Sequence, residues 1–368
     1  MSALWVRAPA GWLGPGRFAE DVVVVVAGGR VAFAGTRREL AAVASPGDRA
    51  ETLGGGPFPP PAGEELDVDG FLLPGVADRH VHIGLSDPGA VLACGVTAVR
   101  DLGWPAEAIF PLAEASESPA FDGPLVRCAG PMLTCPGGYP TRSAWAPPGT
   151  GLEVRGPEDA EAAVRDLAAR GACVVKVALN AEAGPTLSDR ALLAACATAH
   201  ELGLRVTAHC QGPGQVERAL GAGVDELAHC PWTEGLPEDV VGAAARRVRV
   251  VSTLDIHSYG ADTPELRTAT DNLRRFVEAG GRVAYGTDLG NGPIPPGIHP
   301  GEVRHLLAAG LSVEGVLAAM VARPLAPGEP GDLVAVGADP RENPAGLGRV
   351  LVTVRGGRLV RPPGAGRG

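Results

Sequence analysis

The chain has 368 residues, of which 45% are hydrophobic, so it is long enough for two domains or for one barrel with an appendage. Its formal net charge is −10 and no basic patch stands out, which excludes nucleic acid as an expected partner. The first residues lack a signal-peptide core, the early apolar run Val22–Ala27 is too short to cross a bilayer, and the seven cysteines contain no CxxC pair, so we expect a cytoplasmic protein with no membrane partner.

Short β-type patterns mark both ends of the chain. They cover Asp21–Val26, Val31–Ala34, Leu66–Val68, Asp332–Val336, Val350–Val354 and Arg358–Val360. Each end also carries a strand–glycine–strand hairpin pattern, VAGGRVAFAG and VRGGRLV. We expect the two ends to pair into one small β-sandwich, a composite domain of residues 1–72 and 329–368.

Strand and helix patterns alternate along the middle of the chain, which is typical of parallel βα units. Eight strand candidates end near Ala77, Asp101, Gly130, Ala178, His209, His229, Leu254 and Asp288. The clearest helical patterns cover Glu158–Arg170, Ser188–Leu202, Pro213–Gly221, Pro237–Arg247, Pro264–Ala279 and Gly301–Ala322. Eight such units predict an α/β fold, a (β/α)8 TIM barrel over residues 73–328, with the irregular stretch 131–156 as a candidate substrate loop.

Histidines gather at the predicted strand ends. His80 and His82 end the first strand, His209 the fifth and His229 the sixth, and Asp288 ends the eighth. Side chains two residues apart on a strand point to the same side, here toward the barrel mouth. Neutral imidazoles suit borderline divalent ions such as zinc, and a carboxylate nearby can take a proton from a metal-bound water. The pattern predicts a metal site at the mouth.

Lysine usage singles out one residue. The chain has 31 arginines and a single lysine, Lys176, which lies on the predicted fourth strand. Only a primary amine can deprotonate, react with CO2 and become a carbamate, whereas a guanidinium cannot. Two cations a few ångströms apart repel each other, and a carbamate would bridge them with a negative charge. The alternatives are a bridging carbamate and an unmodified lysine at the mouth.

Several segments resemble the amidohydrolase superfamily. The matching parts are PGVADRHVH around His80 and His82, the strand with Lys176, the strand ends at His209 and His229, and GTD at Asp288. GVTAVRDLG, AHELGLRVTAHC, AGVDELAHC and YGTDLG are similar to segments of imidazolonepropionase-related and prolidase-like amidohydrolases. The terminal segments GRVAFAG and GDLVAV are similar to the small β-sandwich of that family, so the resemblance covers nearly the whole chain.

The resemblance implies a centre of one or two divalent ions, zinc above all. Its ligands would be His80, His82, Lys176, His209, His229 and Asp288. The first two histidines and Asp288 would hold one ion, the other two histidines would hold the second, and carbamylated Lys176 would bridge the pair. Asp288 would also be the catalytic residue, first as general base and then as the acid that protonates the leaving amine.

The implied reaction is hydrolysis of a C–N bond in a small molecule (an amide, cyclic amide or dipeptide) by attack of a metal-bound hydroxide. The same ligands serve an ester, lactone or phosphotriester hydrolase. Deamination is a weaker alternative, because Gly212 stands where single-metal deaminases of the superfamily place a glutamate, three residues after His209. A non-enzymatic role in assembly is disfavoured because all six ligand-type residues are present.

Four residues are candidates for binding the substrate: Tyr139, Arg142, His257 and Tyr259. Tyr139, in CPGGYP, stands where relatives often carry a histidine, and Arg142 is a candidate for a substrate carboxylate. His200 and His305 are expected to be structural, Glu226 is expected to face away from His229, and the roles of His257 and His299 stay open. The substrate, the metal, the number of ions and whether the chain forms a homo-oligomer also stay open.

Overall fold

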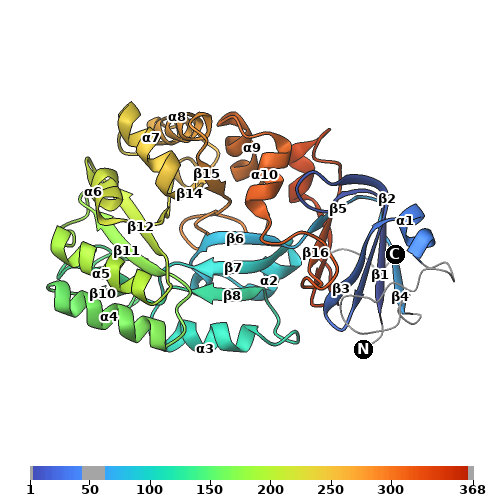
Figure 1. Cartoon of the computed structure of the whole chain (residues 1–368), viewed down its shortest axis with the longest axis horizontal. Helices are drawn as coiled ribbons and strands as arrows, with labels where there is room; N and C mark the ends of the chain where they lie inside the picture. The colour runs from blue at the N-terminus through green and yellow to red at the C-terminus, as the bar shows by residue number, and fades with distance from the viewer. Residues whose placement is uncertain (1–2, 44–62, 364–368) are drawn as a thin grey trace.

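The computed structural model describes residues 3–43 and 63–363, and within these ranges the strands form three sheets of eight, seven and three strands. The eight-stranded sheet, with one short helix beside it, lies at one end of the molecule, and the parallel strands and the other helices make up the rest (Figure 1). No helix in the described ranges is both long enough and apolar enough to span a membrane.

Both ends of the chain contribute to the eight-stranded sheet. In spatial order its strands are β18 (Arg358–Val360), β17 (Val350–Arg355), β16 (Leu333–Val336), β5 (Phe71–Pro74), β1 (Leu4–Trp12), β2 (Phe18–Ala27) and β3 (Arg30–Thr36), with β4 (Glu64–Asp67) beside β1. The short helix α1 (Arg37–Val43) follows β3. The predicted pairing of the two ends is confirmed, because β5 pairs with β1 on one side and with β16 on the other.

Strand β1 is missing from the sequence prediction, because Pro9 interrupts its pattern. In the structure Pro9 makes no rung of the ladder with β2, and Asp21, across from it, adopts a φ of 50°. The valine run of β2 is buried throughout because both faces of the sheet are covered: Val22 and Val24 join one apolar cluster and Val23 joins another.

Eight parallel strands follow in chain order. They are β6 (Val76–Val81), β7 (Val96–Asp101), β8 (Leu125–Cys128), β11 (Val175–Asn180), β12 (Val206–Gln211), β13 (Glu226–Leu227), β14 (Arg249–Val251) and β15 (Arg282–Ala284). The first three form one sheet and the other five form most of the seven-stranded sheet. Two short strands, β9 (Met132–Thr134) and β10 (Gly151–Glu153), extend that sheet beyond β11. They lie within the stretch 131–156, which the sequence analysis treats as irregular.

Backbone hydrogen bonds also connect the two parallel sheets to each other at both edges. Cys173 N donates to Cys128 O at 2.9 Å, next to β8 and β11. At the other edge, Arg79 N donates to Tyr285 O at 3.0 Å and Asp288 N donates to His80 O at 2.8 Å. Every neighbouring pair of the eight strands is therefore joined, the last with the first.

Helices follow the parallel strands. They are α2 (Pro88–Ala93), α3 (Ala106–Ser116), α4 (Pro157–Ala169), α5 (Asp189–Glu201), α6 (Gln215–Ala222), α7 (Glu238–Arg247), α8 (Pro264–Glu278), α9 (Pro300–Ala308) and α10 (Val313–Met320), with single turns η1 (Ile83–Leu85), η2 (Asp255–His257) and η3 (Pro344–Gly348). The helix predicted over Gly301–Ala322 is wrong as one element. Gly310, with a φ of 91°, follows α9, and the Ser312 hydroxyl accepts from Gly315 N to start α10.

The predicted first strand of the barrel is also two strands. β5 belongs to the terminal sheet and β6 to the parallel strands, and Gly75 separates them. A Cβ at Gly75 would lie 2.4 Å from Thr97 Oγ1, so only glycine lets the chain cross there. His80 and His82 therefore lie at the end of β6 alone.

Arg355 of β17 ties the terminal sheet to the parallel strands. The residue is only 6% exposed, and its guanidinium donates to the carbonyl oxygens of Ser116, Ser118 and Gly123, in the segment that joins α3 to β8. Arg358 donates to Pro119 O and Phe121 O in the same segment. The carbonyl groups of this segment therefore accept their hydrogen bonds from arginine side chains of the terminal sheet.

Arg355→Met should lower the free energy of unfolding by about 2–4 kcal/mol, because it leaves buried carbonyl groups without donors. Urea unfolding followed by circular dichroism measures the change. The control is Arg361→Met, at an exposed position of the same terminal segment, which should stay within about 0.5 kcal/mol of the parent chain. Equal effects of the two substitutions would contradict the role given to Arg355.

Candidate metal centre

Three buried side chains meet where the first parallel strand adjoins the last. His80 and His82 come from β6, and Asp288 follows β15. The Nε2 atoms of both histidines lie 3.3 Å from Asp288 Oδ1. The possible ligand atoms of the three residues all lie within 4.8 Å of one another. Asp288 has a φ of 60°, and its backbone N donates to His80 O, so the turn that presents the carboxylate is tied to β6.

The ring orientations of three histidines are set by contacts at Nδ1. This atom of His80 lies 2.7 Å from Ala228 O, and that of His82 lies 3.0 Å from Gly103 O. His229 Nδ1 lies 2.9 Å from the hydroxyl of Thr253. A carbonyl oxygen accepts only from a protonated Nδ1, which leaves the lone pair of a neutral imidazole on Nε2. In His80 and His82 that atom faces Asp288.

Two further histidines lie beside this group. The ring centroids of His80 and His229 are 4.4 Å apart, and those of His229 and His209 are 4.8 Å apart. The register of β11 and β12 places Lys176 opposite Thr207, two residues before His209, so Lys176 and His209 share one face of the sheet. All six predicted ligands are thus buried, and the four histidines form one continuous cluster.

Lys176 is a fully buried polar residue of the site, and its amine Nζ has no hydrogen-bond partner among the described residues. Burial lowers the pKa of Lys176 to about 7. Its charge in turn contributes to lowering the pKa values of His80, His209 and His229. A buried amine without a partner is rare and points to a missing group next to it.

Burial dominates the ionisation of the other site residues. It lowers the pKa of His209 to about 3 and those of His80 and His229 well below the ordinary value. Burial also opposes charge on Asp288 and His82. The neighbouring His80 and His82 outweigh it for Asp288, whose pKa falls, and the hydrogen bond to Asp288 outweighs it for His82, whose pKa rises. Burial therefore favours neutral imidazoles at His80, His209 and His229, whereas His82 is paired with the ionised carboxylate of Asp288.

This donor set fits a divalent metal ion. Imidazole nitrogens and carboxylate oxygens are the ligands that zinc and similar ions take, and the His80–His82–Asp288 group presents three of them on one point. The amine of Lys176, on the same face as His209, has no hydrogen-bond partner among the described residues and leaves room for a further group beside the histidines.

Other histidines predicted to be structural lie away from this cluster. His200 pairs with Asp225 at 2.9 Å, and His305 pairs with Asp255 at 3.0 Å. His299, whose role the sequence left open, also binds Asp255, at 3.1 Å, and its ring accepts from Gly301 N at the start of α9.

The expected orientation of Glu226 is wrong. Its register with Thr207 puts it on the face of Lys176, because β13 ends at Leu227 and the chain then bends before His229. The Glu226 carboxylate is buried and pairs with Arg100 and Arg249. These ion pairs occupy both of its carboxylate oxygens.

The four candidate substrate residues separate into two pairs. Tyr139 stacks on His209, with centroids 5.0 Å apart, and His257 stacks on Trp232, whose ring meets His209 and His229 edge-on. Arg142 is exposed, and its guanidinium lies against the backbone of Gly137. Tyr259 is 50% exposed, with its hydroxyl over Gly292.

Two tryptophans were missed by the sequence analysis. The Trp145 ring lies 4.6 Å from that of His82, and the Trp232 ring lies 5.6 Å from that of His209. The available signal was their position: Trp232 follows His229 by three residues, and Trp145 lies in the long stretch after the third parallel strand. Tryptophan is scarce in this chain, with five residues in all.

Solved structures of similar fold cover nearly the whole chain. A Xaa-Pro dipeptidase with bound methionine superposes with a TM-score of 0.75 at 20% identity, covering 98% of this chain and 100% of its own. The ochratoxinase of A. niger superposes with a TM-score of 0.77 at 19% identity, covering 100% of this chain and 97% of its own. A putative prolidase from Bifidobacterium longum superposes with a TM-score of 0.76 at 23% identity, covering 100% of this chain and 96% of its own. At these identities the likeness concerns the fold.

Sequence comparison reaches the family. An uncharacterised protein of Mycobacterium tuberculosis (strain ATCC 25618 / H37Rv) is 28% identical over 347 residues, covering 82% of this chain and 89% of its own length. The model of the amidohydrolase family matches residues 71–360, which include the whole histidine cluster, Lys176 and Asp288. The chain therefore belongs to the amidohydrolase family and is an enzyme that acts on carbon–nitrogen bonds.

Proposed function

We propose that this enzyme is a metal-dependent hydrolase that cleaves an amide C–N bond of a small molecule. One observation carries the proposal: the Nε2 atoms of His80 and His82 each lie 3.3 Å from the same carboxylate oxygen of Asp288, in a buried cluster that also holds His209 and His229.

The fold supports this assignment. We infer that the eight parallel strands form a (β/α)8 barrel over residues 73–328, because hydrogen bonds join each strand to the next and the last to the first. The terminal sheet would curve into a β-sandwich of residues 1–72 and 329–368, of which 1–2, 44–62 and 364–368 lie outside the described residues. One apolar cluster contains both Val24 of β2 and Val352 of β17. The four histidines and Asp288 lie near or just beyond the carboxyl ends of their strands, where barrel enzymes carry their active sites, whereas Lys176 is the second residue of β11.

His80, His82 and Asp288 would hold one ion, zinc being the best match to these donors. His209 and His229 would hold a second ion, and Lys176 would bridge both as a carbamate, which replaces an unpartnered buried amine with an anion. When bound, the metal would polarise the scissile carbonyl and lower the pKa of a water molecule toward neutrality.

Asp288 is the group that can move a proton. Its carboxylate is ionised, and Asn291 Nδ2 donates to Oδ1 at 3.0 Å, which leaves Oδ2 as the less constrained oxygen. In the proposed reaction Asp288 takes the proton of the attacking water and returns it to the leaving nitrogen, so that the product departs as a neutral amine.

The proposal is tested by assaying purified enzyme on an amide, a dipeptide, a lactone and a phosphotriester side by side. The amide or dipeptide should be cleaved with the highest kcat/KM. Faster cleavage of the lactone or of the phosphotriester would favour an ester or phosphotriester hydrolase, because the same donor set serves those reactions.

Lys176→Arg should remove both the carbamate and the second ion. Wild-type enzyme incubated with 13C-bicarbonate should show a carbamate carbon in its NMR spectrum and up to two metal ions per chain. The variant should show no such carbon, at most one ion, and a kcat/KM lower by about 100-fold or more.

The matched control places a lysine elsewhere. Lys176→Arg combined with Arg190→Lys, at an exposed position of α5, keeps one lysine in the chain and should recover neither the label nor the metal. Two ions per wild-type chain without a carbamate signal would show that Lys176 is unmodified.

Asp288→Asn should lower kcat by about 10²–10⁴-fold, because the amide cannot carry the proton from water to the leaving group. Steady-state kinetics with metal content measured in parallel separates lost proton transfer from lost metal. Asn291→Ala, which removes only the hydrogen bond to Asp288 Oδ1, should change kcat less than tenfold. A variant Asp288→Asn that retains half of the wild-type kcat would disprove the assigned role.

The metal-free protein should lose stability as the pH falls below about 6.5. His209 has a folded pKa of about 3, so between these values the unfolded chain binds the proton that the folded chain excludes. Each such histidine lowers the free energy of unfolding by up to about 1.4 kcal/mol per pH unit. His209→Gln should flatten this dependence by up to about 2 kcal/mol between pH 7 and pH 5.

Urea unfolding of chelator-treated protein at several pH values measures this dependence. His200→Gln, at a residue outside the cluster that pairs with Asp225, is the control and should leave a steeper dependence than His209→Gln. Identical pH dependence of the His209→Gln variant and the wild type would contradict a buried neutral His209.

A further inference from the structure

Aromatic rings line two sides of the histidine cluster. On one side, Trp145 packs at 4.6 Å from His82, and Tyr139 stacks on His209 at 5.0 Å with an interplanar angle of 24°. The rings of Tyr139 and Trp145 are 6.2 Å apart, so they form one continuous surface.

The other side is built by Trp232 and His257. Trp232 meets His209 and His229 edge-on, with centroids 5.6 and 5.4 Å apart. His257 stacks on Trp232 at 4.4 Å and 26°. We call Tyr139, Trp145, Trp232 and His257 the aromatic wall. Its four rings contact three of the four clustered histidines or one another, so the aromatic wall lies directly beside the proposed metal site.

His257 adds one unused polar atom to the aromatic wall. Its Nε2 is buried and has no hydrogen-bond partner among the described residues. Burial lowers the pKa of His257 to about 4, so the ring is neutral at physiological pH. A buried nitrogen without a partner destabilises the protein unless a ligand satisfies it. A neutral imidazole is suited to one hydrogen bond with an uncharged polar group.

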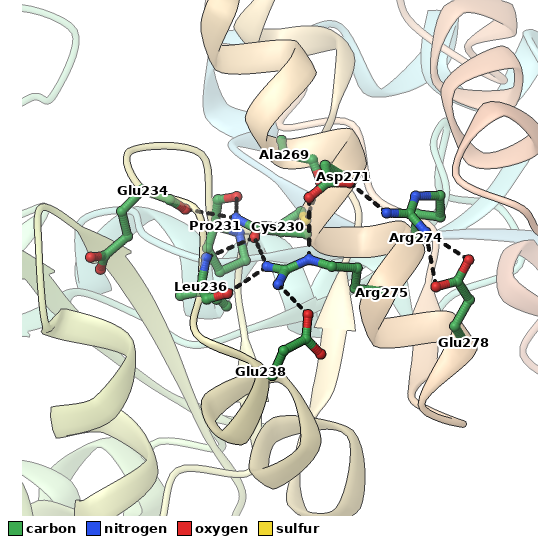
Figure 2. Close-up of polar contacts among 11 residues, drawn as sticks. Cys230, Pro231, Glu234, Leu236, Glu238, Ala269, Asp271, Arg274, Arg275 and Glu278 are labelled. Atoms are coloured by element: carbon green, nitrogen blue, oxygen red, sulfur yellow. Dashed lines mark hydrogen bonds and ion pairs between the residues drawn. The ribbon is translucent and has the colours of Figure 1, made fainter.

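The loop that carries Trp232 is held rigidly on α8. Figure 2 shows this loop, from Cys230 to Glu238, beside Ala269 and Arg275 of the helix. Cys230 Sγ donates to Ala269 O at 3.1 Å, and Arg275 Nη1 reaches Glu238 at 3.0 Å.

Asn272 completes this attachment. Its amide donates to Pro231 O at 2.9 Å and to Glu234 O at 2.8 Å, and it accepts from Leu236 N. Trp232 is therefore flanked on both sides by anchored residues. A ring held in place before binding loses little conformational entropy when it stacks on a ligand.

A fixed cation for a substrate carboxylate is not part of the aromatic wall. In the described part of the chain the two arginine–ring contacts are Arg170 on Phe110 and Arg341 on Phe18, both outside the site. Lys176 is buried on the ligand face, and Arg142, the predicted carboxylate ligand, lies exposed against Gly137. Recognition of a free carboxylate usually depends on such a cation, and none of the four rings of the aromatic wall supplies one.

We infer that the aromatic wall selects substrates in which a flat, uncharged aromatic ring adjoins the scissile amide, in preference to amino acids and dipeptides with a free carboxylate. This inference rests on the proposed function and names its substrate class. Flat rings stack on Trp232 and Tyr139, and His257 Nε2 binds one neutral polar group of the ligand. A cationic ligand, which aromatic rings also attract, is repelled by the divalent ions that the donor set would hold.

The test uses four matched probes: acetanilide, N-cyclohexylacetamide, 4-acetamidobenzoate and N-acetyl-L-proline. The first two differ in planarity, the third adds a carboxylate to the ring, and the fourth has a carboxylate without an aromatic ring. The readouts are kcat/KM and, on metal-free protein, the Kd from titration calorimetry. Wild-type protein should bind acetanilide at least tenfold more tightly than the other three.

Variants at Trp232 isolate the contribution of the aromatic wall. The preference for acetanilide is the ratio of its kcat/KM, or of its affinity, to that of N-cyclohexylacetamide. Trp232→Ala should lower both ratios about tenfold or more, and Trp232→Phe should retain most of the preference. Comparing ratios cancels the different reactivities of the two amides. Trp5→Ala, in β1 of the terminal sheet, is the control and should leave the ratio unchanged.

Two results overturn the inference: tighter wild-type binding of N-acetyl-L-proline than of acetanilide, or an equal loss for both neutral amides in Trp232→Ala. Failure of the proposed function looks different. In that case no C–N bond is cleaved by the metal-loaded enzyme, and the affinities measured on metal-free protein still decide whether the aromatic wall binds flat rings.

Discussion

The junction between the first and the last parallel strand is the constraint on which the rest of the site depends. Asp288 N donates to His80 O, and beneath them the buried Asp78 carboxylate accepts from His80 N, Thr287 N and the Thr287 hydroxyl. Except for the bond from His80 N, these bonds join residues about two hundred positions apart in the chain. They hold the carboxylate of Asp288 against His80 and His82, next to β6. The same hydrogen bonds therefore join the last parallel strand to the first and bring the ligand group together.

Burial then decides the chemistry of the cluster. A charge removed from water is unfavourable unless it is paired or ligated, and here the charges that remain are attached to partners. Asp288 is stabilised by His80 and His82, and the pKa of Asp78 rises to about 7 because burial outweighs its three hydrogen bonds. His209 is neutral, and the amine of Lys176 has no partner. Such an arrangement is poor at holding extra protons and well suited to holding cations.

The residues around the cluster are positioned differently from the ligand-type residues. The metal-type donors come from strands or from the ends of strands, whose spacing the backbone hydrogen bonds dictate. Tyr139, Trp145 and Trp232 come from connecting segments, which need their own anchors: Asn272 and Arg275 hold the segment of Trp232 on α8. This division lets one scaffold keep its hydrolytic centre while its loops change the group that is recognised.

The sequence by itself determined the family, the alternation of strands and helices, the pairing of the two ends, and the positions of the ligand-type residues. These features depend on local patterns: the two-residue spacing of His80 and His82 puts both on one face whatever lies opposite, and a lone lysine is visible by counting. Only the tertiary structure decided which other groups lie next to the ligand-type residues. Contacts between distant segments determine four features of the site. They are the carbonyl partners of the histidines at Nδ1, the bend after β13 that turns His229 back toward the side of Glu226, the rings of Trp145 and Trp232, and the exposed position of Arg142. No local period encodes such contacts, because connecting segments take their shape from the neighbours on which they pack.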